Sequence, residues 1–324
     1  MLATACLILA LFAAMVYTVL MQFGARRGMG RARAPGRGAP VGPGLFNRNV
    51  RWKTGEVQIT DVDTETQLQG LGTGAAATVR VPDGYGHLWG MIPGYSSDSA
   101  ALGSGGAIAI LEGDGIVHGP QHIPLGGSGG ELITGGSTHN PGKQLKNLGI
   151  AVNDGEQITV QTLMVGEDVG TCSVTISFGF LPGNPPVYYK WKALEVQIVA
   201  VDTATQLQGL GTAVAADLEI PGYAIFCDRI IGWVGSDGAA LGSGNVVIRM
   251  TDDGVEDTVE VCIGGAGGEN ITGAGSHFQV VDFDQMGIEI KSGDAAQVDG
   301  YMVGEDMGTV SLCVAWGFVI NPNK

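Results

Sequence analysis

The sequence predicts an all-β protein, and three observations point to that fold class. Glycine accounts for 55 of the 324 residues, whereas charged residues make up only 15% of the chain. Long exposed helices would need more Lys, Glu and Arg than this. Apolar and polar residues also alternate with a period of two in many short segments, as at Val174, Ile176 and Phe178. Such alternation indicates strands with one buried face, joined here by glycine-rich turns.

A long internal duplication divides most of the chain into two similar units. TETQLQGLGT at 64–73 returns as TATQLQGLGT at 203–212. MVGEDVGTCSVTISFGF at 164–180 returns as MVGEDMGTVSLCVAWGF at 302–318. The offset between matched segments stays at 138 or 139 residues. This period is too long for a solenoid or a propeller, so each unit is expected to be a complete domain.

Each unit is expected to fold as one antiparallel sandwich. Seven or eight short strands fit into a unit, and an eight-stranded jelly roll is the natural choice at this length. Trp52 and Trp191 stand between basic residues at the same place in the two units. We predict a first jelly roll at 52–182, a proline-rich linker at 183–189 and a second jelly roll at 190–324. Because the linker is short, the two should be held side by side.

The N-terminal residues 1–23 are expected to form a transmembrane helix. The run carries no charged side chain. As a helix it would be about 33 Å long, enough to cross about 30 Å of hydrocarbon. A cleaved secretory signal is the alternative, but such a signal normally begins with Lys or Arg, which this run lacks. The arginines follow the run instead, and the positive-inside rule then predicts a body on the cytosolic side.

The basic neck at 24–51 is expected to be an extended linker that lies over an anionic membrane surface. It is dense in Gly, Pro and Arg, a composition that cannot bury enough apolar surface to fold alone. Each Arg close to such a surface contributes about 1 kcal/mol to binding. The residues predicted to contact the membrane are Tyr17, Arg26, Arg27, Arg31, Arg33 and Arg37.

Charge is distributed unevenly along the chain. Residues 1–53 hold eight of the 17 basic side chains and none of the 32 acidic ones. The acidic body should repel nucleic acid, so no specific nucleic-acid partner is expected. The chain has an odd number of cysteines, five, and no CxxC motif. The cysteine positions also differ between the two units. Free buried thiols are therefore favoured over disulfide bonds.

Acidic residues recur at the same place in both units. GEDVG at 166–170 and GEDMG at 304–308 each hold two adjacent carboxylates. A calcium site is one interpretation, since calcium prefers oxygen ligands. An acidic hairpin turn is the other, and it is favoured because adjacent strand residues point to opposite faces. Three further clusters are expected to be solvated loops: Asp61–Asp63, Asp252–Asp253 and Asp282–Asp284.

No motif in the chain predicts catalysis. His118 and His122 are four residues apart, but the intervening Gly119 and Pro120 prevent the helix that would align them for zinc. The glycine-rich stretch at 126–136 lacks the Lys-Ser/Thr of a phosphate-binding loop. No nucleophile elbow is present. We therefore expect no enzyme activity, no catalytic residue, no cofactor and no metal.

Two tandem jelly-roll-sized domains behind an N-terminal membrane segment resemble the double jelly-roll major capsid proteins of tailless icosahedral viruses. Many of those viruses enclose a membrane beneath the shell. The resemblance covers residues 52–320 at the level of architecture. It implies that three chains form a pseudo-hexagonal tower of six jelly rolls, and that the towers tile a shell on the cytosolic face of a membrane. The chain departs from many members because its two units are unusually alike and its membrane segment is N-terminal and long.

The sequence therefore favours a structural role, as a capsid subunit that self-associates into a homotrimer. The expected location is the virion, with the chain anchored in an internal viral membrane. The expected partners are other copies of the chain, lipid and other virion proteins. The alternative is a membrane-anchored cell-surface, surface-layer or glycan-binding module with its body outside the cell. A third class, an anchored carbohydrate-active enzyme, would need a cleft with paired carboxylates.

Overall fold

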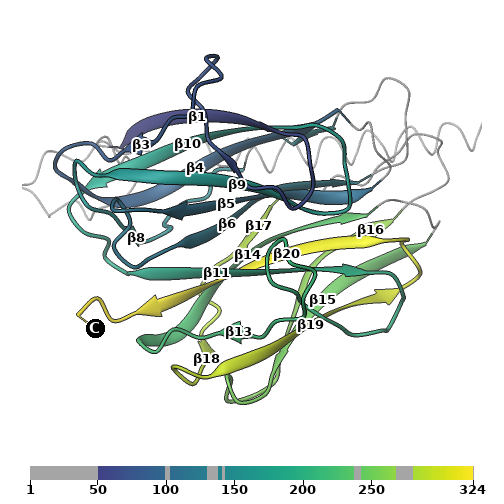
Figure 1. The fold of residues 1–324 in the computed structure, drawn as a ribbon. Helices are drawn as coiled ribbons and strands as arrows, with labels where there is room; N and C mark the ends of the chain where they lie inside the picture. The colour runs from purple at the N-terminus through teal and green to yellow at the C-terminus, as the bar shows by residue number, and fades with distance from the viewer. Residues whose placement is uncertain are drawn as a thin grey trace, which may run out of the picture. The chain divides into compact units, whose positions relative to one another are not determined.

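The computed structural model describes residues 50–98, 103–129, 138–140, 143–236, 242–267 and 280–323, which belong to one unit of the chain. Every regular element in these ranges is a β-strand (Figure 1), so the all-β prediction is confirmed for them. They include no helix of the length and apolarity that crossing a bilayer requires. The predicted helix at 1–23, Tyr17 and the five arginines from Arg26 to Arg37 lie outside the described residues.

The first half of the described chain contains two antiparallel sheets. One has the order β1 (Arg51–Ile59), β10 (Cys172–Pro182), β4 (Tyr85–Ser97) and β7 (Thr138–Asn140), with β8 (Ile150–Ala151) also paired to β4. The other has the order β2 (Thr66–Gln67), β9 (Gln157–Gly166), β5 (Ser104–Glu112) and β6 (Gln121–Gly129), with β3 (Val79–Arg80) also paired to β9.

The second half repeats this arrangement strand for strand. One sheet has the order β11 (Tyr189–Ile198), β20 (Val310–Ile320), β14 (Ala224–Ser236) and β17 (Val281–Phe283), with β18 (Ile288–Glu289) also paired to β14. The other has the order β12 (Thr205–Gln206), β19 (Ala295–Gly304), β15 (Ser243–Thr251) and β16 (Val259–Gly267), with β13 (Leu218–Glu219) also paired to β19. The duplication of sequence is therefore a duplication of strand order.

The period-two alternation places one face of each long strand in the core of its own half. In β10 the inward residues are apolar and buried, whereas Thr175 on the outer face is exposed. The equivalent strand β20 is buried on both faces along its whole length. Its inward residues, such as Trp316, belong to the core of the second half, while Cys313 and Ala315 on the outer face join the core of the first. A neighbour therefore covers the outer face of this sheet.

That neighbour is the first half of the same chain. Strand β6 lies against β11 and β14 (Figure 1), and Trp191 and Trp233 are buried among residues of the first half. The ring of Trp233 lies directly on backbone, because a Cβ at Gly106 or Gly127 would come within 2.7 or 2.5 Å of it. Only glycine fits at these two places. We call this contact the seam.

Several polar groups at the seam are paired across it. Gln121 Oε1 accepts a hydrogen bond from the Trp191 backbone N–H at 2.8 Å, and the Trp191 indole N–H donates to the Leu148 carbonyl at 3.0 Å. The hydroxyls of Ser104 and Ser311 lie 3.0 Å apart. Because unpaired buried polar groups cost about 1–3 kcal/mol each, these bonds hold the two halves in one register.

Equivalent isoleucines give a test of the seam. Ile231 is 0% exposed within it, whereas Ile92, at the same place in the first half, is 37% exposed. Ile231→Ala should lower the free energy of unfolding by about 2–5 kcal/mol, because it leaves a cavity. Ile92→Ala should cost less than about 1 kcal/mol. Urea unfolding of both variants measures the difference, and equal losses would show that the seam adds nothing to stability.

Candidate functional site

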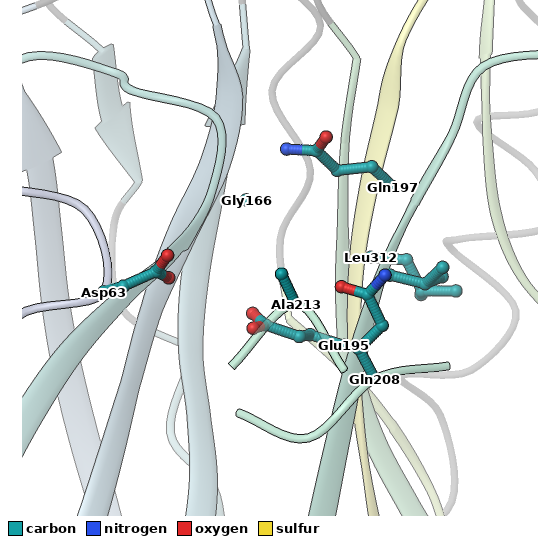
Figure 2. A pocket seen from close by; sticks show the side chains of 8 residues that line it. Asp63, Gly166, Glu195, Gln197, Gln208, Ala213 and Leu312 are labelled. Atoms are coloured by element: carbon teal, nitrogen blue, oxygen red, sulfur yellow. The ribbon is translucent and has the colours of Figure 1, made fainter. Parts of the chain in front are cut away.

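A small pocket opens at the seam, with a carboxyl group on each side of it. Asp63 comes from the loop after β1 in the first half, and Glu195 comes from β11 in the second (Figure 2). Figure 2 shows the two carboxyl groups pointing toward one another. The pocket has a volume of about 140 Å³, well below the roughly 300 Å³ at which small-molecule sites begin. The lining residues are Asp63, Gly166, Glu195, Val196, Gln197, Gln208, Ala213 and Leu312.

Glu195 is the most perturbed acid at this pocket. The side chain is only 7% exposed. Burial raises its pKa to about 8, and the nearby Asp63 carboxylate acts in the same direction. One carboxyl oxygen accepts a hydrogen bond from the Gly211 backbone N–H at 2.6 Å, while the other is buried with no partner among the described residues. Burial therefore favours the protonated form of Glu195.

Sequence reasoning did not find Glu195. The only signal was that Glu56 and Glu195 recur in equivalent EVQI segments. Glu56 is partly exposed and accepts a hydrogen bond from Gly72. Glu195 keeps the equivalent bond but lies beneath the first half. Burial at the seam, which the sequence does not show, makes the difference between the two acids.

The acidic turns use their carboxylates to hold backbone. In the first half Glu167 accepts hydrogen bonds from the backbone and hydroxyl of Ser104 at 2.8 and 3.2 Å. In the second half Glu305 does the same with Ser243, at 2.9 and 3.1 Å. The backbone N–H of Ser243 lowers the pKa of Glu305. The hairpin prediction was wrong, because β9 and β10 lie in different sheets, as do β19 and β20, so each acidic turn connects one sheet to the other. The described residues contain no group of three or more His, Cys, Asp or Glu side chains placed to hold a metal ion.

One acidic cluster differs from expectation. Asp282, predicted to lie in a solvated loop, instead lies in β17 and forms a bidentate ion pair with Arg229 at 2.6 and 2.7 Å. The two side chains are 14% and 5% exposed. Arg229 also donates to the carbonyls of Lys146 and Asn147 in the first half. The prediction was wrong because Arg229 is covered at the seam and its buried charge requires a carboxylate.

His118 and His122 lie on the side of the seam that the first half contributes. The ring of His118 packs against those of Tyr188 and Tyr223. His122 Nδ1 accepts a hydrogen bond from the Ala193 backbone N–H at 3.4 Å. Burial, assisted by the charge of Lys192, lowers the pKa of His122 to about 4. Both histidines therefore have structural contacts across the seam.

The four described cysteines are free thiols. Cys172, Cys227 and Cys313 are buried, and burial raises the pKa of each. Their thiols are accordingly unreactive at neutral pH. Cys262 is exposed on β16.

The pH dependence of stability tests the buried state of Glu195. Its pKa is about 8 when folded, against the usual 4.5. Between these values the folded state holds a proton that the unfolded state has released, so the free energy of unfolding should fall as pH rises, by at most about 1.4 kcal/mol per unit. Glu195→Gln should remove this slope in urea titrations from pH 5 to 8. Glu56→Gln is the control and should keep it; a slope that survives Glu195→Gln would refute the assignment.

No family model and no curated protein matches the chain. Among solved structures it is similar to that of Broad Bean Stain Virus, at 8% identity over 86% of this chain and 91% of that one, with a TM-score of 0.35. The Cowpea mosaic virus top component gives the same four values. The major capsid protein P2 from Bacteriophage PM2 is 10% identical over 84% and 99%, with a TM-score of 0.30.

Proposed function

We propose that the chain is a major capsid subunit that self-associates into an icosahedral shell. The observation that carries the proposal is the seam, which joins two sandwiches of identical strand order into one body through buried tryptophans and paired polar groups. A fused pair of like domains presents two similar sets of lateral surfaces. Such repetition serves a lattice, in which every surface needs a neighbour, more than it serves a single binding site.

The strand order supports a jelly roll in each half. Each sandwich has one sheet that begins with the first strand and continues with the last, and a second sheet built from the intervening strands. Each sheet is a path of four strands with a fifth, two-residue strand paired off it. Two such four-strand paths with long-range pairing are expected of an eight-stranded jelly roll, a fold used in viral capsids and in lectins. We assign the two jelly rolls to 52–182 and 190–324, joined by the linker at 183–189.

The N-terminal region completes the proposal. Residues 1–23 anchor the chain in an internal viral membrane, and the basic neck at 24–51 binds its anionic head groups. The body then lies on the cytosolic side of the host membrane during assembly. The proposed partners are other copies of the chain, membrane lipid and other virion proteins, and the proposed building block is a homotrimer.

Assembly is tested on the full chain purified in mild detergent. Light scattering coupled to size exclusion should give a protein mass three times that of the 33.3 kDa chain. Electron microscopy of native material should show closed particles with hexagonally arranged towers. A chain that stays monomeric at high concentration and forms no particles would favour a membrane-anchored surface module instead.

The anchor is tested by the mature N-terminus and by membrane extraction. Mass spectrometry should find residues 2–23 retained, and the chain should resist alkaline extraction from membranes. Changing the five arginines from Arg26 to Arg37 to Gln should weaken binding of the neck to anionic lipid by about 1 kcal/mol for each Arg. A new N-terminus between residues 15 and 45 would identify a cleaved signal and place the body outside the cytosol.

A further inference from the structure

Exposed apolar side chains of the first half stand where the second half has seam residues. Trp52 is 38% exposed and Ile92 is 37% exposed, whereas the equivalent Trp191 and Ile231 are both 0% exposed. The local geometry is the same, because each tryptophan ring lies 2.8 Å from the Cβ position of the equivalent glycine in the neighbouring strand. The two faces differ in that one is covered by another sandwich and the other, within the described residues, is not.

Leu71 and Leu210 are a third pair of equivalent residues of which only the one in the second half is covered. Leu210 is partly buried and packs against the core that includes the first half. A Cβ at the adjacent Gly211 would lie 3.2 Å from Leu163 of the first half. The equivalent Leu71 is 54% exposed, and a Cβ at Gly72 would meet nothing within 4 Å. The loop that the first half covers in one sandwich is therefore open in the other.

The covering element is also duplicated, and its second copy is open. In the first half β6 covers the seam, and its Pro124, which pairs with Ile108, is buried. In the second half the equivalent strand is β16, and its Cys262, which pairs with the equivalent Val247, is exposed. Among the described residues, each chain thus carries one uncovered face and one covering edge that is not in use. These are the two sides of a single kind of contact.

We infer that β16 of one copy packs on the β1-β10-β4 sheet of another copy, repeating between chains the contact that the seam makes within the chain. This inference rests on the proposed self-association and adds the surfaces that make it. A head-to-tail contact of this kind closes into a ring when its rotation permits. We define the open face as Trp52, Leu71, Ile92, Ser173, Thr175 and Ser177, with the exposed Lys53 next to Trp52 in β1. We define the open edge as Ser243, Glu256, Asp257, Glu260 and Cys262.

The charges on the two surfaces are complementary. At the seam Lys192 lies close enough to His122 for its charge to act on that ring. In the contact between copies Lys53 takes the place of Lys192, and Glu260 takes the place of His122. Lys192 and His122 do not attract each other at the seam, whereas Lys53 and Glu260 would attract each other between copies. Glu256 and Asp257 extend the negative charge of the open edge, which favours contact with Lys53 of a second copy.

The open face is also suited to contact between separate chains. Cys313 and Ala315 at the seam are replaced by Thr175 and Ser177, which keep the uncovered sheet soluble. Interfaces between chains are generally more polar than the core of a domain. The serine pair of the seam, Ser104 with Ser311, has its counterpart in Ser243 of one copy and Ser173 of the next. Equivalent residues thus provide a polar contact at the same place.

Engineered disulfides test this contact directly. In the full chain in detergent, S173C/S243C should form covalent dimers and trimers between copies under oxidising, non-reducing electrophoresis. The matched control S104C/S311C places thiols where two hydroxyls lie 3.0 Å apart within one chain, and it should form a bond without covalent oligomers. The single variants S173C and S243C should show only the wild-type background, which includes any product of Cys262.

A charge exchange provides a second, independent measurement. Lys53→Glu and Glu260→Lys should each weaken self-association, measured by sedimentation, by about tenfold or more, because like charges then face each other. The double variant K53E/E260K should recover most of the wild-type affinity. Both side chains are exposed, so the substitutions should leave folding intact, and the unfolding midpoint checks this.

The outcomes separate this inference from the proposed function. If wild-type chains form trimers but S173C/S243C stays monomeric on the gel and K53E/E260K fails to recover, copies associate through another surface and the inference is wrong. If wild-type chains do not self-associate at all, both the inference and the proposed function are wrong. Covalent oligomers of S173C/S243C together with recovery in the double variant establish the contact.

Discussion

Burial of one outer sheet face is the constraint on which the rest of the structure depends. A sandwich needs only its inner faces to form a core, yet β20 is buried on both sides. The outer face can be apolar because Trp191 and Trp233 pack against the first half, and Gly106 and Gly127 let the Trp233 ring approach the backbone closely. Close approach maximises dispersion contacts and excludes water. The two sandwiches therefore behave as one body rather than as two domains on a linker.

The same burial accounts for the unusual acid–base properties of the chain. Glu195, His122 and Cys313 all lie at the seam, and in each case removal from water is the largest cause of the pKa shift. The direction is the one that favours the neutral form: upward for the acids and downward for the histidine. The fully charged Arg229 instead retains Asp282 as a partner. A perturbed pKa here indicates packing between sandwiches and does not by itself indicate chemistry.

Much of the fold could be predicted from the sequence, because period-two alternation and a constant repeat offset are local signals. The sequence could not predict which sheet face is covered, because Trp52 and Trp191 have nearly the same neighbours in sequence. Which of two equal residues is buried depends on which sandwich lies against it, and that is a property of the whole chain. For the same reason Glu195 was missed and Asp282 was placed in solvent. The acidic segments were predictable as turns between consecutive strands, but their passage from one sheet to the other was not, because sheet membership depends on long-range strand pairing.

The surface residues of the two halves differ according to whether the surface is covered within the chain. Where the first half covers the second, facing residues such as Ala315 and His122 are apolar or neutral, and the charged Arg229 has Asp282 as its partner. At the equivalent places that remain uncovered, the chain has Ser177 and an acidic edge around Glu260. A permanent contact tolerates apolar surface because it is never separated, whereas a contact made between free subunits must also be compatible with water. The two halves have kept one fold while their outer surfaces have become suited to these different conditions.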